Sequence, residues 1–174
     1  MKKKSLLVVA VAVIGCSAFA YTWTGGANDG GLWTTPQNWG ETSGYPQSAS
    51  DPVIFNGSAT VSLNTGAQTD IGYIKVSAGN VVITATSGSS LKINWPGYNN
   101  PSGVTGDRGI IVSKGASLDL GVSLAEMSGR FDRQGEGELI VRNSAITKTG
   151  SANMYFFNGT NSFVGTTSLS LPSA

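Results

Sequence analysis

Short extended segments, each ended by a turn residue, follow one another along the chain from residue 52 onward. They are rich in Val, Ile, Leu and Thr and lie at residues 53–55, 60–63, 71–76, 81–84, 91–93, 110–112, 118–120, 139–141 and 168–171. Apolar and polar residues often alternate within them, which predicts β-strands with one buried face. After residue 20 no stretch keeps a 3.6-residue period for three turns, so we expect an all-β fold with almost no helix.

Two pairs of segments repeat a longer pattern. Residues 74–79 (IKVSAG) can be laid over residues 110–115 (IIVSKG), because both read apolar–x–Val–Ser–x–Gly and lead into a second short strand. Residues 139–147 follow the same pattern more loosely. A second echo joins residues 55–61 (FNGSATV) to residues 157–163 (FNGTNSF). Such echoes indicate a structure built from repeated units.

Repeated strand–turn units predict a β-solenoid, in which the strands of successive coils stack in parallel about 4.8 Å apart. At about 20 residues per coil, near the lower end of known solenoid repeats, residues 52–174 would form about six coils. An antiparallel β-sandwich has the same short strands and turns and remains the alternative. The internal echoes favour the solenoid.

Tryptophan and glycine set residues 21–51 apart from the rest of the chain. Trp23, Trp33 and Trp39 lie here among glycine pairs and prolines, which break regular structure. So short a segment cannot bury three indoles internally, whereas a repeat stack needs an atypical cap over its terminal hydrophobic face. We therefore predict a Trp- and Gly-rich N-terminal cap at residues 21–51, followed by solenoid coils at residues 52–174.

The first twenty residues contain the three parts of a secretory signal peptide. Three lysines at residues 2–4 precede an apolar run at residues 6–15, and residues 18–20 (AFA) offer a cleavage site after Ala20. This run is too short for a bilayer core, which needs about 20 apolar residues. We expect residues 1–20 to be removed and the mature chain to be secreted, with no membrane span.

One alternative lies inside this leader. Residues 13–16 (VIGC) resemble a bacterial lipobox, in which Cys16 would carry the lipid and begin the mature chain. Acyl chains would then tether the protein to a membrane. Cysteine is also a common small residue in the apolar part of signal peptides, which favours cleavage after Ala20.

The lack of histidine and the single cysteine limit the chemistry available to this chain. A His-based catalytic triad, a histidine metal cage, a thiolate cluster and a disulfide framework are excluded. The repeat patterns of calcium sites are also missing, and we expect neither a metal nor another cofactor. Without the three leader lysines, eight of the 11 basic residues face ten acidic ones, a net charge of −2. Such a surface offers no basic patch to nucleic acid or anionic lipid.

Charged residues are densest between residues 126 and 138. Polysaccharide-active β-helices use acidic pairs, or Asp with Arg, on adjacent coils of one sheet. The candidates for such a site are Asp107, Arg108, Arg130, Asp132, Arg133, Glu136 and Glu138. Residues 128–137 are bounded by glycines, and mixed charges in such a stretch are typical of a solvated loop. We therefore expect no catalytic residue and no enzymatic activity.

A polar aromatic loop offers a binding site of another kind. Trp95 and Tyr98 lie in residues 94–101 (NWPGYNNP), where an indole could stack on a sugar face while asparagines meet its hydroxyls. The alternative is that both rings anchor the loop. For the three cap tryptophans a capping role is favoured over ligand binding.

A set of short motifs resembles one known family. The motifs are residues 22–26 (TWTGG), Trp33, residues 38–39 (NW), 51–55 (DPVIF), 135–139 (GEGEL) and 161–169 (NSFVGTTSL). In this order they resemble exported bacterial proteins with autotransporter-associated β-strand repeats. The resemblance implies a right-handed parallel β-helix of the pectin-lyase-like type at the cell surface, with this chain as an N-terminal portion.

These observations predict an exported, non-enzymatic bacterial cell-surface or extracellular β-solenoid that acts as a structural or adhesive module. A carbohydrate-binding module using Trp95 and Tyr98 is the alternative, and a polysaccharide-active enzyme fragment is a weaker one. Polysaccharides or other surface proteins are the expected partners. The sheet edge of the C-terminal coil is a candidate site for self-association.

Overall fold

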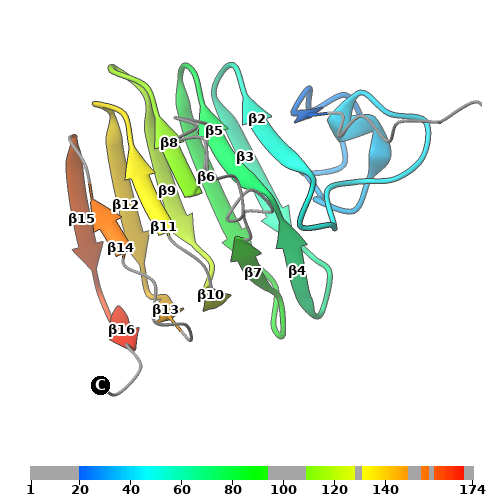
Figure 1. Ribbon diagram of the computed structural model, residues 1–174. Coiled ribbons are helices and arrows are strands. Elements are labelled where there is room, and N and C mark those ends of the chain that lie inside the picture. Colours follow the sequence, from blue (N-terminus) through cyan, green and yellow to red (C-terminus); the bar gives the residue numbers. More distant parts are fainter. Residues whose placement is uncertain (1–19, 94–108, 128–130, 149–153, 157–158, 171–174) are drawn as a thin grey trace, which may run out of the picture.

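The computed structural model describes residues 20–93, 109–127, 131–148, 154–156 and 159–170 (Figure 1). Within these ranges it contains sixteen short strands and a single 3-10 helix, η1 (Pro36–Trp39). The strands are β1 (Tyr21–Thr22), β2 (Pro52–Phe55), β3 (Ala59–Leu63), β4 (Gln68–Ile71), β5 (Tyr73–Val76), β6 (Asn80–Ala85), β7 (Ser90–Ile93), β8 (Gly109–Val112), β9 (Ser117–Gly121), β10 (Leu124–Met127), β11 (Phe131–Gln134), β12 (Glu138–Arg142), β13 (Ala145–Lys148), β14 (Met154–Phe156), β15 (Thr160–Val164) and β16 (Ser168–Ser170). The prediction of an all-β chain with almost no helix is confirmed.

The strands form three sheets, and from β2 onward each strand pairs with the strand three places further along the chain. The sheet orders are β1-β2-β5-β8-β11-β14, β3-β6-β9-β12-β15 and β4-β7-β10-β13-β16. All strand pairings within the described ranges are parallel. Figure 1 shows the successive strand triplets side by side along one direction. Parallel pairing is thus confirmed, and the described strands lack the antiparallel pairing that the β-sandwich alternative requires.

The register of the first sheet gives the length of one triplet of strands. Val53 pairs with Ile74, 21 positions along the chain, and Ile74 pairs with Ile110, 36 positions along. The longer step includes residues 94–108, which lie outside the described ranges. The described strands form five triplets where about six coils were predicted, because the shorter steps span 21 to 23 residues and one step is much longer.

The two echoes in the sequence differ in how well they predict the register. Residues 74–79 and 110–115 do stack, because Ile74 pairs with Ile110 and Val76 with Val112. Residues 139–147 were wrongly aligned with them: β12 lies in the second sheet, where Leu139 pairs with Leu118. Each triplet repeats the apolar alternation three times, so a loose match does not tell which sheet a strand joins. Gly57 and Gly159 of the other echo occupy the turns before β3 and β15, both in the second sheet.

Alternate residues of the strands point inward and stack in columns. In β5, Ile74 and Val76 are fully buried while Tyr73 and Lys75 are half-buried. The same alternation fills the interior with aliphatic side chains from all three sheets, including Val61, Ile71, Ile83, Leu91, Leu118, Leu120, Leu124, Val141 and Ile146. Each such side chain stabilises the fold by roughly 1.5–3 kcal/mol when fully buried, so these columns supply the main driving force for folding.

A column of small residues lets the turns of successive triplets stack closely. Gly79, between β5 and β6, has φ +77°, and a Cβ atom there would lie 2.4 Å from the backbone nitrogen of Ser58 in the preceding triplet. Only glycine combines this left-handed backbone with so close an approach. Ser117 N then donates to Gly79 O at 3.0 Å, which continues the contact into the next triplet.

Residues 20–51 lie against the N-terminal edge of the stack. β1 pairs with β2 in parallel, and Leu32 forms a parallel bridge with Ser62 of β3. The first two sheets therefore receive backbone partners at an edge that would otherwise expose unpaired N–H and C=O groups. Trp33 and Trp39 are buried here, and their ring centroids lie 4.8 Å apart in an edge-to-face arrangement.

The prediction of a solvated charged loop at residues 128–137 is wrong for its central part. Residues 131–134 form β11, which lies between β8 and β14, and Asp132 and Arg133 are fully buried. Arg133 pairs with Ile110 and so takes a position in an aliphatic column of the first sheet. The strand went unpredicted because the residues FDRQ carry no apolar alternation, and its place is set by pairing with its neighbours.

Candidate functional site

The residues predicted to bind carbohydrate, Trp95 and Tyr98, lie outside the described residues, as does the alternative lipidation site Cys16. The same holds for three of the charged candidates, Asp107, Arg108 and Arg130. Their roles stay predictions. The described part of the chain contains a different candidate, a groove beside Trp23.

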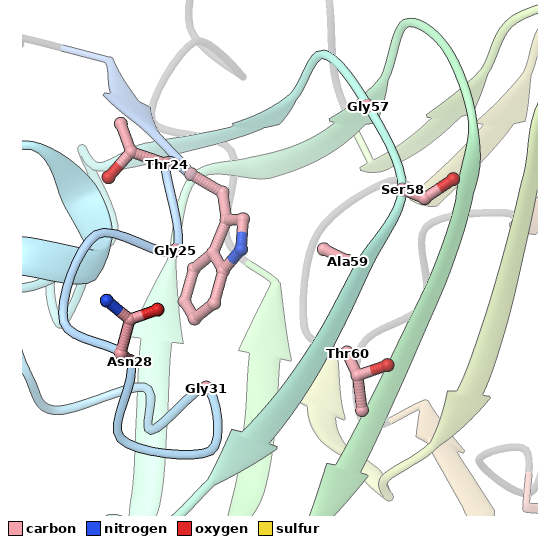
Figure 2. Close-up of a pocket in the computed structure, with 9 residues that line it drawn as sticks. Thr24, Gly25, Asn28, Gly31, Gly57, Ser58, Ala59 and Thr60 are labelled. Atoms are coloured by element: carbon pink, nitrogen blue, oxygen red, sulfur yellow. The ribbon is translucent and has the colours of Figure 1, made fainter.

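This groove is an open cavity of about 470 Å³ between residues 20–51 and the first strand triplet. One wall is formed by Trp23, Thr24, Gly25, Asn28 and Gly31, and the other by residues 57–60 from the β2–β3 turn and β3. Figure 2 shows the two walls facing each other, with Gly25 and Asn28 opposite Ser58, Ala59 and Thr60. We refer to these nine residues as the Trp23 groove. Its volume falls within the range of about 300–1,000 Å³ that is typical of small-molecule sites.

Asp29 shapes the loop that forms the first wall. Its Oδ1 accepts hydrogen bonds from Gly31 N at 3.0 Å, from Leu32 N at 3.1 Å and from Asn38 Nδ2 at 2.9 Å. A side-chain hydrogen bond with Thr35, followed by the one with Asn38, lowers the pKa of Asp29 from 3.8 to about 2. The carboxylate is therefore charged at neutral pH and holds the loop in one conformation.

Asn38 ties the same loop to the rest of the cap. This side chain is fully buried, and its Nδ2 donates to Asp29 and to Leu32 O at 2.9 Å while its Oδ1 accepts from Ala27 N at 3.0 Å. Its backbone oxygen accepts from Thr24 N at 2.7 Å. A buried amide with every polar atom bonded fixes local structure strongly, because leaving any of them unpaired is costly.

Gly31 brings the loop onto β3. Ser62 N donates to Gly31 O at 2.9 Å, and Trp33 N donates to Ser62 O at 2.9 Å. Gly31 has φ +79°, and a Cβ there would lie 2.2 Å from the carbonyl oxygen of Thr60. Both walls of the Trp23 groove are thus joined by backbone hydrogen bonds, which makes the groove a preformed feature of the fold.

Trp23 differs from the other two tryptophans of the cap. Its indole is half-buried, with an edge-to-face contact to Trp39 at 4.8 Å and a tilted contact to Phe55 at 6.0 Å. The indole N–H groups of Trp33 and Trp39 donate to backbone oxygens, at 2.9 and 2.7 Å respectively. Within the described residues, Trp23 Nε1 has no such acceptor.

The remaining lining is polar and uncharged. Asn28 and Thr60 are exposed and make no side-chain hydrogen bond to any described residue, so both remain available to a ligand. Ser58 accepts from Asn80 N at 3.1 Å, and the Thr24 hydroxyl donates to Gln37 O at 3.0 Å. The nine lining residues include no acid, base or thiol. The lining therefore offers a ligand hydrogen-bonding groups and an aromatic ring.

The sequence predicted one capping role for Trp23, Trp33 and Trp39, and the groove was not predicted. All three indoles lie in similar Gly-rich surroundings, and only the fold decides which of them is covered. One signal was available: Asn28 lies between a glycine pair and Gly30, and it adopts φ +53°, which asparagine tolerates better than most residues.

Four charged residues of the predicted enzyme candidate lie in the described ranges: Asp132 and Arg133 are buried, Glu138 is half-buried and Glu136 is exposed. Arg133 is buried and donates to the backbone oxygens of Gln134 at 2.7 Å, Gly137 at 2.6 Å and Gly135. Burial lowers the pKa of Arg133. Glu136 is exposed and lies 3.6 Å from Lys114. Among the described residues there is no group of three or more His, Cys, Asp or Glu side chains that could hold a metal ion.

No described helix has the length and apolar character needed to cross a membrane. The chain matches no family model, and no curated protein or solved structure is significantly similar to it. The resemblance to autotransporter-associated β-strand repeats therefore stays a prediction.

Proposed function

We propose that this protein is an exported, non-enzymatic β-solenoid that serves as a structural or adhesive module at a bacterial cell surface. The observation that carries the proposal is the three-strand period of the parallel sheets, which continues from β2 to β16. Three sheets with this connectivity are expected when a chain winds repeatedly around one axis as a right-handed parallel β-helix. Such a rod presents a rigid surface and needs no reactive side chain.

Export is the second part of the proposal and is supported by residues 1–20, with their lysines, apolar run and AFA ending. Partners at the surface would be polysaccharides or other surface proteins. Lipidation at Cys16 would tether the rod, whereas cleavage after Ala20 would release it. The resemblance to autotransporter-associated β-strand repeats supports the same setting.

Backbone NMR on the mature chain tests the solenoid. We expect contacts between the amides of Ile74 and Ile110, and between those of Val53 and Ile74, in the pattern of parallel pairs. Short contacts between α-protons of facing residues, which mark antiparallel strands, would overturn it. Contacts between strands that pair in a different register would also contradict the winding.

Expression of residues 1–174 in a bacterial host, followed by fractionation and intact-mass measurement, tests export. A mature chain that begins at Tyr21 supports cleavage, and one that begins at lipidated Cys16 supports the tether. An unprocessed cytoplasmic protein would contradict the proposal. A Cys16→Ser variant separates the two routes, because it blocks lipidation and leaves the AFA site intact.

Carbohydrate binding is the second candidate function. It was predicted for Trp95 and Tyr98, and the observation that now favours it is the polar groove beside the half-buried indole of Trp23.

A further inference from the structure

The Trp23 groove carries an inference about the ligand of this surface. We propose that it is a binding site for a neutral carbohydrate chain, with Trp23 as the stacking platform and Asn28 and Thr60 as hydrogen-bonding groups. The inference rests on the proposed function in one respect: a cell-surface location is where the chain would meet a glycan. The binding itself can be measured on the purified mature chain.

Unlike Trp33 and Trp39, Trp23 keeps its indole partly open. Trp33 and Trp39 are 0% and 2% exposed and donate their N–H groups to backbone oxygens, as expected of core tryptophans. Trp23 packs on Trp39 and Phe55 yet stays half-buried, and its N–H has no acceptor in the described structure. A held, partly open indole offers an electron-rich face to the C–H groups of a sugar ring.

The lining of the groove is polar and uncharged. Besides Trp23, the groove presents an amide at Asn28 and hydroxyls at Ser58 and Thr60, with no charged side chain among the nine lining residues. Hydroxyls and amides match the hydroxyl groups of a sugar. A charged ligand would find no counter-charge in the lining, which selects a neutral glycan over an acidic one.

The groove is held in place by hydrogen bonds before any ligand binds. The Asp29 carboxylate and the buried Asn38 amide fix the loop of the first wall, and the pairing of Gly31 and Trp33 with Ser62 fixes its distance from β3. Ligand binding would then cost little ordering of the protein. The cavity of about 470 Å³ is open to solvent, as a site that admits one part of a longer polysaccharide must be.

Affinity electrophoresis in native gels tests the proposal, using gels that contain a neutral mixed-linkage glucan, mannan or xylan, and a gel containing polygalacturonate as the acidic comparison. We expect at least one neutral polysaccharide to retard the native chain. Trp23→Ala should weaken that binding by about tenfold or more, the factor that corresponds to about 1.4 kcal/mol. Phe163→Ala, which removes a 52% exposed aromatic ring at the other end of the stack, is the matched control and should bind as the native chain does.

A second pair of variants guards against misfolding of Trp23→Ala. Thr60→Arg keeps all the tryptophans but fills the groove, and it should abolish retardation, whereas Thr84→Arg places the same side chain at an exposed position on β6 and should not. Asn28→Gly removes the amide without straining the positive φ, and a several-fold loss is expected.

The proposal is overturned if no neutral polysaccharide retards the native chain, if polygalacturonate is bound more tightly, or if Thr60→Arg binds normally. Failure of this inference alone would leave export and parallel pairing intact. Failure of export with normal binding would instead remove the surface setting and keep the site. Antiparallel contacts in the NMR experiment would contradict both the proposed solenoid and the proposed binding site.

Discussion

The two ends of the stack differ in whether their buried polar atoms all have hydrogen-bond partners. At the N-terminal end, the indole N–H groups of Trp33 and Trp39 and the amide of Asn38 all have partners. In the last triplets, Arg133 Nε and Asn161 Oδ1 are buried and have no hydrogen-bond partner among the described residues. A satisfied polar network stabilises its surroundings, whereas a half-satisfied one weakens them. We infer that stability decreases along the stack from the cap toward β15.

The burial of apolar side chains also decreases from the cap toward β15. Val61, Ile83, Leu120 and Val141 are 0% or 1% exposed in one column of the second sheet. Phe163 continues this column on β15 by pairing with Val141, yet it is 52% exposed. The layer that contains it therefore gains much less from burial than the layers near the cap.

The largest expected effect is the loss of a cap indole. Trp39→Ala removes edge-to-face contacts with Trp23, Trp33 and Tyr21 and leaves a cavity at the end of the stack. We expect the free energy of unfolding to fall by about 3–5 kcal/mol. Urea denaturation followed by far-UV circular dichroism measures the loss. Trp23→Ala, at a half-buried position, should cost less than half as much, and equal losses would contradict the distinction between the two indoles.

The next largest effect probes the opposite end through Arg133. Arg133→Ala removes a fully buried side chain and its hydrogen bonds to backbone oxygens, so we expect a loss of about 2–4 kcal/mol. Arg133→Met fills the column with an apolar chain but leaves the backbone oxygens of Gln134 and Gly137 without their donor, so we expect a smaller loss of about 1–2 kcal/mol. The same denaturation assay compares the two variants. Equal losses would show that the guanidinium stabilises this end, against the inferred gradient.

A smaller effect separates the two ends at their turns. An added Cβ at Gly79 would lie 2.4 Å from Ser58 N, and one at Gly159 would lie 2.4 Å from Gly137 O. The clashes are similar, but the neighbours of Gly159 belong to the less stable end and can shift at lower cost. We expect Gly79→Ala to destabilise by about 2–3 kcal/mol and Gly159→Ala by about 1–2 kcal/mol. A larger loss for Gly159→Ala would reverse the gradient.

Hydrogen exchange can check the gradient without any substitution. Amides of β3 and β6 should be protected longer than those of β12 and β15, because exchange from a stable region requires more extensive opening. Exchange rates measured by NMR on the mature chain decide this, and uniform protection across the four strands would mean that the stack unfolds as one unit.

The sequence predicted the architecture better than the site. The register of residues 74–79 on 110–115 was predictable because alternation and a turn glycine are both present, and together they define which face is buried. β11 was not, because its inward residue is an arginine and its place depends on hydrogen bonds to β8 and β14. The Trp23 groove forms between residues 23–31 and residues 57–60, which are 26 to 37 positions apart in the chain. The local sequence pattern does not tell which indole is left partly open when two such distant segments meet.

The smallest effect concerns acid, and it acts on the cap alone. The pKa of Asp29 is lowered to about 2 in the folded chain from 3.8, so its stabilising contribution is complete above pH 3.8 and is lost as the pH falls toward 2. Asp29→Asn cannot lose a charge in this window and should show a shallower fall in stability between pH 5 and pH 2. Because Trp23, Trp33 and Trp39 all lie in the cap, their fluorescence should respond to acid before the far-UV signal of the strands does. An identical acid response in both chains would show that the Asp29 network does not hold the cap, and the inferred contrast between the two ends would lose its polar basis.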